Sequence, residues 1–334
     1  MQLSYYNPFL RLKLFSKVWE MAGTVHDKLN RENPNTAPSR LAIFFDYLQG
    51  WIAHGFSIVQ YHDYEIYKVR RCVRKNIVTN RRALKLEKIY NNTNDTKWIE
   101  NKALFNEKFK TCVKRKWLLM KDASESDFIS VLGGIKKVII KPTGGERGEG
   151  IYIKEVTDSK LQELYNALRG KDFLVEEVIK QNDEMAFGRT SVNTIRMYTL
   201  LDDNGNAHLL KSVLRVGAPG NDVDNYHCGG SIWPLDRNDG FVECAGKTLA
   251  VSIPIYNLPL TGEFMLGYRI PNYQKAVQAV LESAKLIPTV RYIGWDVAIT
   301  DVGVEIIEAN SSPDNDFHCL GVERNYYKRL LDYK

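Results

Sequence analysis

The segment 294–310 constrains the fold of this chain most, because two apolar runs flank a short turn there. The runs IGWDVAIT and VEIIEAN are typical of two buried strands. The Asp-Val-Gly sequence at 301–303 predicts a three-residue hairpin loop, in which Thr300 pairs with Val304. An antiparallel hairpin of known register then predicts which side chains lie opposite each other further along both strands.

In this register, stepping back by twos places Asp296 directly opposite Glu308. Asn310 lies two residues beyond Glu308 and so shares its face of the strand. Like charges opposite one another are unfavourable unless a cation lies between them, and two carboxylates with an amide suit Mg²⁺. The alternative is a solvated acidic face, but the apolar neighbours favour buried strands. The hairpin therefore predicts a metal site formed by Asp296, Glu308 and Asn310.

A glycine-rich stretch, KPTGGERGEG, follows a predicted strand that ends at Lys141. Lys141 can place a positive charge on phosphates, and Gly144, Gly145 and Gly148 allow the backbone to approach them closely. The spacing matches neither a Walker P-loop nor a Rossmann fingerprint. The alternative is an ordinary mobile hairpin loop, so the phosphate interpretation depends on the neighbouring metal hairpin.

A second predicted hairpin joins TIRMYTLL to AHLLKSVLRV through an Asn-Gly turn, the strongest short-range hairpin signal. This turn pairs Tyr198 with Lys211 and Arg196 with Val213. Arg196, Tyr198, Lys211 and Arg215 then share one face of the sheet, opposite an apolar face that meets a core. The pattern predicts a cationic sheet face, and its alternative is a strand face exposed to solvent.

The chain as a whole is expected to be α+β, with three parts. Residues 1–95 have helical apolar spacing and no motif with chemistry, and a polar break follows them. Residues 96–175 and 176–334 contain the predicted strands, and strand pairing in the second half is expected to be largely antiparallel.

Composition excludes some classes of protein. With 334 residues and 44% hydrophobic residues the chain can bury a large core, while no run of about 18 apolar residues could cross a bilayer. The first residues lack a cleavable leader pattern, so a cytoplasmic location is expected.

The basic run 68–88 could meet phosphates, an anionic membrane surface or nucleic acid, but no nucleic-acid-binding motif accompanies it. We expect no nucleic-acid partner and leave peripheral membrane contact open.

These elements, in this order, resemble the ATP-grasp superfamily over about residues 96–320, and within it the sugar-transfer-associated and α-L-glutamate-ligase-like proteins. The resemblance implies an ATP-grasp fold in which two α+β subdomains with antiparallel sheets clasp Mg-ATP. Residues 96–175 would form the small, lid subdomain. Residues 176–334 would form the large subdomain with the metal and acceptor sites. WDVAITDVGVEIIEANSSP resembles the superfamily's metal hairpin, which implies that Asp296, Glu308 and Asn310 hold Mg²⁺ beside the ATP phosphates.

The same resemblance implies further contacts. ENKALF and IIKPTGGERGEGI resemble the two lysine motifs of the nucleotide site, and FLVEEVIKQNDE resembles the hinge, where Glu177 and Val178 would offer backbone groups to adenine. LKSVLRVGAPGNDVDNYHCGG resembles the substrate segment of glutamate-ligase-like members. The implied nucleotide contacts are Lys102, Lys141, Gly144, Gly145, Gly148, Glu176, Glu177, Val178 and either Asp183 or Glu184 for the ribose. The implied phosphoryl or acceptor contacts are Lys211, Arg215 and Asn225, and Arg196 on the predicted cationic face is a further candidate catalytic residue.

This set implies an ATP-dependent carboxylate–amine ligase that uses ATP and Mg²⁺ and acts through an acyl phosphate. Its partners would be a small-molecule or glycan-linked carboxylate and an amine, in the context of surface-polysaccharide or sugar-conjugate biosynthesis. Two alternatives stay open: a kinase that phosphorylates a sugar or polyol hydroxyl, and a protein that binds nucleotide or nucleic acid without turnover. The sequence does not indicate an oligomeric state.

Overall fold

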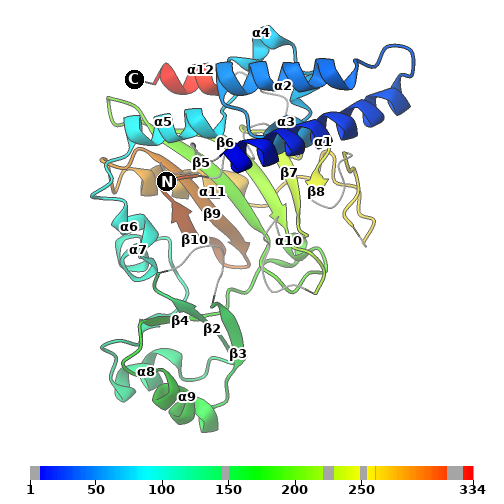
Figure 1. Ribbon diagram of the computed structural model, residues 1–334. Helices are drawn as coiled ribbons and strands as arrows, with labels where there is room; N and C mark the ends of the chain where they lie inside the picture. The colour runs from blue at the N-terminus through cyan, green and yellow to red at the C-terminus, as the bar shows by residue number, and fades with distance from the viewer. Residues whose placement is uncertain are drawn as a thin grey trace. The chain divides into compact units, whose positions relative to one another are not determined.

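The computed structural model describes residues 8–144, 150–220, 229–248, 254–259, 261–313 and 326–333. The chain divides into two compact units. Residues 1–86 and 314–334 form the first unit, and residues 87–313 form the second. The sequence-based division has its first boundary near residue 95 and assigns the C-terminal residues to the large subdomain. Both sheets belong to the second unit (Figure 1).

The described part of the first unit is helical, which confirms the helical N-terminal region. Its helices are α1 (Pro8–Glu32), α2 (Arg40–His54), α3 (Ile58–Asp63), η2 (Ile66–Lys68), α4 (Arg71–Arg74), α5 (Asn80–Tyr90), whose last turn belongs to the second unit, and α12 (Tyr326–Leu331). The Ser39 hydroxyl accepts the Ala42 N–H at the start of α2, and Gly55 ends this helix with a φ of 79°. No helix among the described residues is long and apolar enough to cross a membrane.

The smaller sheet has four antiparallel strands in the order β1-β4-β2-β3. They are β1 (Trp117–Leu119), β2 (Lys137–Pro142), β3 (Tyr152–Glu155) and β4 (Phe173–Glu177). Helices α8 (Glu125–Leu132), η3 (Asp158–Lys160) and α9 (Leu161–Leu168) complete this part. Figure 1 shows α8 and α9 together on one side of the sheet, where Phe128 and Leu164 join a core with Val138 and Val175. Alternating burial along β2 reflects this one covered face.

The larger sheet has six antiparallel strands in the order β10-β9-β5-β6-β7-β8. They are β5 (Thr194–Leu201), β6 (Ala207–Val216), β7 (Ser231–Leu235), β8 (Lys247–Thr248), β9 (Tyr292–Thr300) and β10 (Gly303–Asn310). Three short helices, α6 (Lys97–Glu100), α7 (Lys102–Lys108) and α10 (Asp183–Ala186), and the longer α11 (Tyr273–Ala284) accompany it. Ala276 and Val280 of α11 pack with Met197, Trp295 and Val297 of the sheet. The expected antiparallel back half is confirmed.

The β9–β10 hairpin corrects one detail of the expected register. The loop is one residue shorter than expected, because Gly303 pairs with Thr300, so Thr300 does not pair with Val304. A β-bulge between Ile306 and Glu308 then adds the residue that the loop lacks. As a result Glu308 still lies opposite Asp296, as the sequence predicted.

The β5–β6 hairpin has the expected pairs, Tyr198 with Lys211 and Arg196 with Val213. A bulge between Tyr198 and Thr199 again offsets a turn that differs from the expected two-residue loop. All eight residues of β5 are buried, Arg196 among them with 7% of its surface exposed. The predicted cationic face is therefore not an open solvent-facing surface at β5.

Candidate functional site

Three charged side chains lie in register across neighbouring strands of the larger sheet. Glu308 of β10 is opposite Asp296 of β9, and Asp296 is opposite Arg196 of β5. Directly opposed residues in antiparallel strands project from the same face. Trp295 and Val297, the neighbours of Asp296 on β9, pack into the core with α11, so the charged side chains project from the other face. We call these three charged residues, together with Arg215 of β6, which also bonds to Asp296, the carboxylate–arginine row.

Asp296 is 3% exposed and is held by two arginines. Its Oδ1 accepts a hydrogen bond from Arg196 Nε at 2.6 Å, and its Oδ2 accepts from Arg196 Nη2 at 3.0 Å and from Arg215 Nη1 at 3.1 Å. Burial by itself raises the pKa of Asp296, but the two guanidinium charges outweigh burial and hold the pKa below its ordinary value. Asp296 is thus a carboxylate that stays ionised inside the protein.

Glu308 is different, because its side chain reaches solvent. Partial desolvation by the surrounding protein and the charge of Asp296 raise the pKa of Glu308, while Lys141 and Arg196 oppose the rise. The side chain is exposed, so the repulsion by Asp296 acts on a carboxylate that water still reaches. Glu308 therefore carries negative charge that the protein compensates only in part, in a place where a cation can reach it.

Asn310 lies on β10 two residues beyond Glu308, opposite Gly294. Gly294 leaves room for the side chains of Arg196 and Pro313, since a Cβ at position 294 would lie 3.5 Å from Arg196 Nη1 and 3.0 Å from Pro313 Cβ. The structure thus brings the three predicted metal ligands onto adjacent strands.

The donor set fits a divalent cation. Glu308 is exposed and Asn310 is half-buried, so both can offer oxygen to an ion, as Mg²⁺ prefers. Asp296 would have to share oxygen Oδ2 with arginine or release it, because both of its oxygens already accept hydrogen bonds. Among the described residues, no group of three or more His, Cys, Asp or Glu side chains is arranged to hold a metal. The predicted site differs from such a group, because it has two carboxylates and one amide.

Two lysines lie close enough to the row to influence its charges. Burial lowers the pKa of Lys102, Glu308 opposes this shift, and Lys141 adds to it. Lys102 begins α7, and its N–H lies 3.5 Å from the carbonyl of Thr143, just after β2. Lys141 near the end of β2 in turn opposes the rise in the pKa of Glu308. Lys102, Lys141 and Glu308, from three separate elements, therefore influence one another's charge.

Lys141 is held by Glu176 of β4, whose Oε2 lies 2.6 Å from its Nζ as an ion pair rather than an aligned hydrogen bond. Burial alone raises the pKa of Glu176, but Lys141 and Arg115 outweigh it and bring the pKa to about 2. The amide of Asn106 in α7 also donates to Glu176, at 2.7 Å. Glu176, expected to contact nucleotide, is thus engaged by protein cations.

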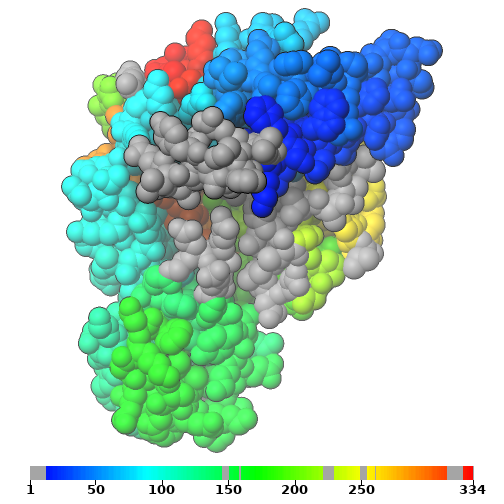
Figure 2. Space-filling view, viewed as in Figure 1, coloured from blue at the N-terminus to red at the C-terminus, as the bar shows by residue number. Residues whose placement is uncertain are grey.

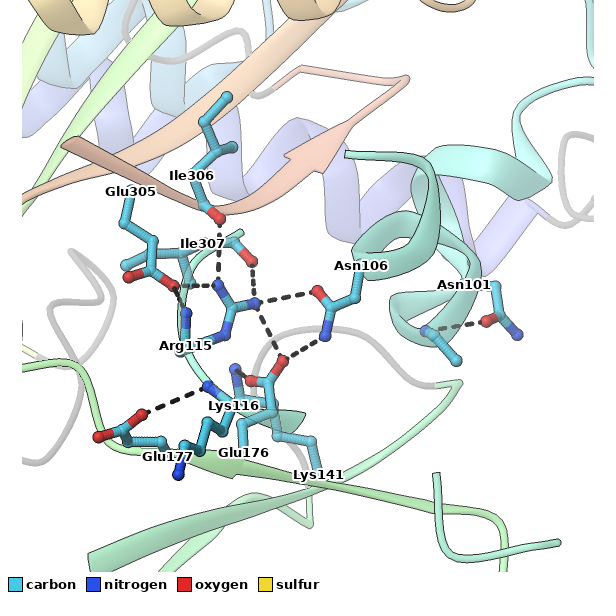
Figure 3. Close-up of polar contacts among 11 residues, drawn as sticks. Asn101, Asn106, Arg115, Lys116, Lys141, Glu176, Glu177, Glu305, Ile306 and Ile307 are labelled. Carbon is cyan, nitrogen blue, oxygen red and sulfur yellow. Dashed lines mark hydrogen bonds and ion pairs between the residues drawn. The ribbon is translucent and has the colours of Figure 1, made fainter. Parts of the chain in front are cut away.

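Arg115 lies at the centre of these contacts (Figure 3). Its Nη2 is 2.9 Å from Glu176 Oε1, and its Nη1 is 2.9 Å from Glu305 Oε1. It also donates to the carbonyls of Ile306 and Ile307, at 3.1 and 3.0 Å. Ile307 is the extra residue of the β10 bulge, and Ile306 precedes it. One buried guanidinium therefore joins the smaller sheet to the strand that presents Glu308.

Sequence reasoning missed Arg115, Asn106 and Glu305. Glu305 was visible only as a charged residue within a buried strand pattern, where an unpaired carboxylate would be unfavourable. A buried Glu305 therefore predicts a buried cationic partner, but the sequence does not identify the residue that provides it.

Glu177 and Val178, the predicted hinge residues, line a solvent-open hollow of about 600 Å³ together with Lys116, Lys136, Lys137 and Lys180. The N–H of Glu177 already donates to the Lys116 carbonyl at 2.8 Å, and that of Val178 to the Lys137 carbonyl at 3.3 Å. A contact with adenine would therefore use their carbonyl oxygens. The hollow shares no lining residue with the carboxylate–arginine row.

The remaining predicted residues are placed less closely. Asp183 and Glu184 form the exposed first turn of α10, and no described hydrogen bond or ion pair joins them to the row. Lys211 lies on β6 opposite Tyr198 and is half-buried. A Cβ on Gly144 would meet open space. Gly145, Gly148 and Asn225 lie outside the described residues.

Comparison with known structures gives low overall similarity. The chain resembles the ATP-grasp ligase PsnB complexed with minimal precursor, Mg and ADP, at 13% identity and a TM-score of 0.43, covering 73% of this chain and 61% of that chain. It resembles N5-carboxyaminoimidazole synthetase from Staphylococcus aureus complexed with ADP at 12% identity and a TM-score of 0.44, covering 71% of this chain and 52% of that chain. It resembles the D-alanine-D-alanine ligase from Coxiella burnetii at 13% identity and a TM-score of 0.38, covering 65% of this chain and 48% of that chain. The chain thus spans less than two thirds of each of these structures.

No curated protein sequence gives a significant match to the chain. A family model described as sugar-transfer associated ATP-grasp matches residues 81–323, which include both sheets and the whole carboxylate–arginine row. This match confirms the ATP-grasp fold expected from the sequence. Because it extends over well more than half of the 334 residues, the chain belongs to the sugar-transfer associated ATP-grasp family.

Proposed function

We propose that this chain is an ATP-dependent ligase that uses ATP and Mg²⁺ to activate a carboxylate as an acyl phosphate and then joins it to an amine. The observation that carries the proposal is the carboxylate–arginine row with Lys102 and Lys141 beside Glu308. The row combines oxygen ligands and fixed cations and contains no nucleophilic side chain. Phosphoryl transfer needs positioning and charge stabilisation more than a protein nucleophile.

In this proposal, Lys102 and Lys141 offset the negative charge of the ATP phosphates. Glu308 and Asn310, with Asp296, would hold Mg²⁺, which supplies additional charge stabilisation between the phosphates. The hinge carbonyls of Glu177 and Val178 would contact adenine, and Asp183 or Glu184 the ribose. The glycines 144, 145 and 148 would lie over the phosphates.

Arg196 and Arg215 would act on the acceptor side. Both are cations fixed by Asp296, so they need no reorganisation to meet a carboxylate or the transferred phosphoryl group. Lys211 and Asn225 complete the proposed acceptor contacts. An oxygen of the acceptor carboxylate attacks the γ-phosphorus and ADP leaves. The amine then attacks the acyl carbon, loses a proton and displaces phosphate.

The family assignment supports ATP as the nucleotide, and its description supports an acceptor that belongs to a sugar-transfer process. We therefore propose a sugar acid or a glycan-linked carboxylate as acceptor, in surface-polysaccharide or sugar-conjugate biosynthesis. The proposed location is cytoplasmic, where ATP is available.

Hydroxylamine trapping tests the proposal. A panel of carboxylates is incubated with the protein, Mg-ATP and hydroxylamine, and products are identified by mass spectrometry. The right acceptor should give a hydroxamate with stoichiometric ADP, because hydroxylamine captures an acyl phosphate. Lys141→Ala and Asp296→Asn should suppress it, whereas Lys154→Ala, which removes an exposed lysine from the neighbouring strand β3, should not.

Two outcomes contradict the ligase. A stable phosphate ester formed with ADP, without hydroxamate or free phosphate, identifies a kinase that acts on a hydroxyl group. ATP binding without turnover across carboxylates, amines and sugars identifies a nucleotide-binding protein. Circular dichroism of each variant separates lost chemistry from lost folding, which matters for Asp296→Asn because the change leaves two arginines less well compensated.

A further inference from the structure

Helix α2 in the first unit has apolar residues on two opposite faces. Ile43, Tyr47 and Gly50 are buried against the rest of the unit. Phe45 and Ile52 lie on the opposite face and are 58% and 66% exposed. A helix that is apolar all round is ordinarily enclosed on all sides. The outward face of α2 therefore stays largely exposed among the residues of its unit that the structure describes.

The outward face begins at Leu41, which is 54% exposed. Leu41, Phe45 and Ile52 are separated by four and seven residues, so they form one stripe along the helix. Eleven residue steps separate Leu41 from Ile52, so this stripe is about 17 Å long. Contiguous exposed apolar surface of this kind marks a place of interaction.

Helix α1 extends the apolar surface sideways. Its Phe15 and Trp19 rings lie 6.2 and 5.8 Å from the Phe44 ring, which in turn lies 5.6 Å from the Phe45 ring. Phe15 is 51% exposed and Trp19 41%. Figure 2 shows atoms of both helices, in two shades of blue, on the surface toward the viewer. We call the exposed residues Phe15, Trp19, Leu41, Phe45 and Ile52 the α1–α2 apolar face.

Arginines lie at both ends of this face. At the start of α2, the Arg40 guanidinium carbon lies 4.3 Å from the centre of the Trp19 ring, and Arg40 donates to the Trp19 carbonyl. Near the end of α2, Arg81 donates to the Ile52 carbonyl at 3.1 Å. Arg40 is bonded to the backbone of α1 and Arg81 to the backbone of α2, so positive charge is fixed at each end of the stripe.

Negative charge on the same helix is neutralised. Asp46, the one acidic residue of α2, accepts from Arg74 at 2.7 Å and from Arg71 at 3.0 Å. Residues 8–86 carry fourteen Lys and Arg against six Asp and Glu, whereas residues 87–313 carry 28 against 30. The excess positive charge is thus concentrated in the unit that presents the apolar face.

The charges decide among possible occupants. A second copy would bring the same positive charge to the interface, and repulsion would oppose that dimer. Nucleic acid offers negative charge but little to cover Phe45 and Ile52. An anionic lipid surface offers both, because its headgroups attract arginines and its interfacial region accepts Trp, Phe, Leu and Ile side chains.

We propose that the α1–α2 apolar face docks on anionic membrane surfaces, with α2 lying in the plane of the interface. The side chains of Phe45 and Ile52 enter the boundary between headgroups and acyl chains, and the terminal arginines meet lipid phosphates. The enzyme would then act beside a membrane, where lipid-linked acceptors are concentrated.

Vesicle flotation with the full chain tests this. The probes are vesicles of phosphatidylcholine alone and vesicles with about one third phosphatidylglycerol. The protein should float with the anionic vesicles and much less with the neutral ones. The double variant Phe45→Ser/Ile52→Ser should lower the partition coefficient on the order of tenfold or more, since it removes two large apolar side chains. Phe264→Ser, which changes a 59% exposed phenylalanine in the other unit, should float like wild type.

Three results would overturn the proposal. They are no flotation with anionic vesicles, flotation that the double variant leaves unchanged, and a wild-type dimer that the double variant converts to monomer. The last would show that the face joins two copies of the chain. Circular dichroism and basal ATP turnover without vesicles should be the same in the double variant and wild type, because neither residue belongs to the proposed Mg-ATP site.

Discussion

At the residue scale, substitution of Glu308 tests whether this residue is a metal ligand or a structural carboxylate. Its side chain is exposed, so Glu308→Gln removes one charge and leaves no buried group unpaired. Folding should persist or improve slightly, because repulsion by Asp296 disappears. ATP turnover at saturating Mg²⁺ should fall on the order of a hundredfold or more, since charge stabilisation by a metal supplies several kcal/mol.

The measurement is ADP release by the purified variant, with a urea melt to check its fold. Glu263→Gln is a suitable control, because it also neutralises an exposed carboxylate of the second unit, outside the carboxylate–arginine row. Wild-type turnover in well-folded Glu308→Gln would place the metal elsewhere.

Glu176 predicts a pH dependence of stability. Its pKa in the folded protein is about 2, against an ordinary value of 4.5, because Lys141 and Arg115 overcome the effect of burial. A lowered folded pKa contributes stability that is full above the unfolded pKa and is lost as pH falls from about 4.5 toward 2. The shift corresponds to about 3 kcal/mol as an order of magnitude.

Urea unfolding at several pH values between about 6 and 3 measures this dependence. The free energy of unfolding of wild type should fall more steeply with decreasing pH than that of Glu176→Gln, which is less stable at neutral pH but lacks this titration. Parallel curves would mean that Glu176 does not titrate differently in the folded and unfolded chains.

Single residues differ in how far the sequence reveals them. Asp296 and Glu308 could be paired from the sequence because they flank one short turn, although the pair depends on a bulge that offsets the shorter loop. Arg115 could not be identified, since it lies 190 positions from Glu305 and 61 from Glu176 in the chain. No local periodicity connects residues that meet only when two sheets are assembled.

At the scale of elements, the β9–β10 hairpin shows how a correct result followed from an incorrect step. The expected three-residue loop was wrong, and the bulge before Glu308 added the missing residue to the strand. Bulges leave weak sequence signals because the extra residue, Ile307 here, is an ordinary strand former. The Asp296–Glu308 pair is thus fixed by the bulge, which local patterning did not reveal.

Arg115 holds that bulge, so replacing it tests the connection between elements. Arg115→Ala removes a buried cation and leaves Glu176 and Glu305 without their shared partner. The free energy of unfolding should fall by about 3–5 kcal/mol. Arg115→Lys keeps the charge but loses the fork that reaches the Ile306 and Ile307 carbonyls. It should therefore recover part of the stability and still impair turnover.

Urea unfolding and ATP turnover of both variants provide the test, and Arg169→Ala, which changes an exposed arginine at the end of α9, is the control. If Arg115→Lys restored full turnover, its bonds to the bulge would not position Glu308. If Arg115→Ala were as stable as Arg169→Ala, the network would contribute no net stability.

At the scale of the whole molecule, the helical N-terminal region and the antiparallel second half followed from apolar periodicity and hairpin turn signals. The grouping of the C-terminal residues with the first unit did not. In that unit the N–H of Tyr327 donates to the carbonyl of Asn76 at 2.9 Å, and Arg82 lies over the Tyr327 ring. Two short segments some 250 positions apart carry too little pattern to predict such a pairing.

The division into two units predicts that they unfold separately and that only one of them responds to nucleotide. Each unit buries its own core, with Ile43, Tyr47 and Phe56 in the first and Met197, Trp295 and Val297 in the second. The proposed Mg-ATP site lies wholly within residues 87–313. Scanning calorimetry without ligand should therefore show two transitions. A ligand that binds only the folded second unit stabilises that unit by about 2.7 kcal/mol at a hundred times its Kd.

For a unit of this size, that stabilisation raises Tm by about 5–10 °C. We expect a non-hydrolysable ATP analogue with Mg²⁺ to move one transition by this amount and to leave the other within about 1 °C, because the first unit contributes no proposed ligand contact. Glu308→Gln should lose most of the shift, while Phe45→Ser/Ile52→Ser should keep it. A single transition that moves as a whole would show that the two units unfold as one. Variants in the helical unit identify its transition, and a shift confined to that transition would place the nucleotide site in the first unit.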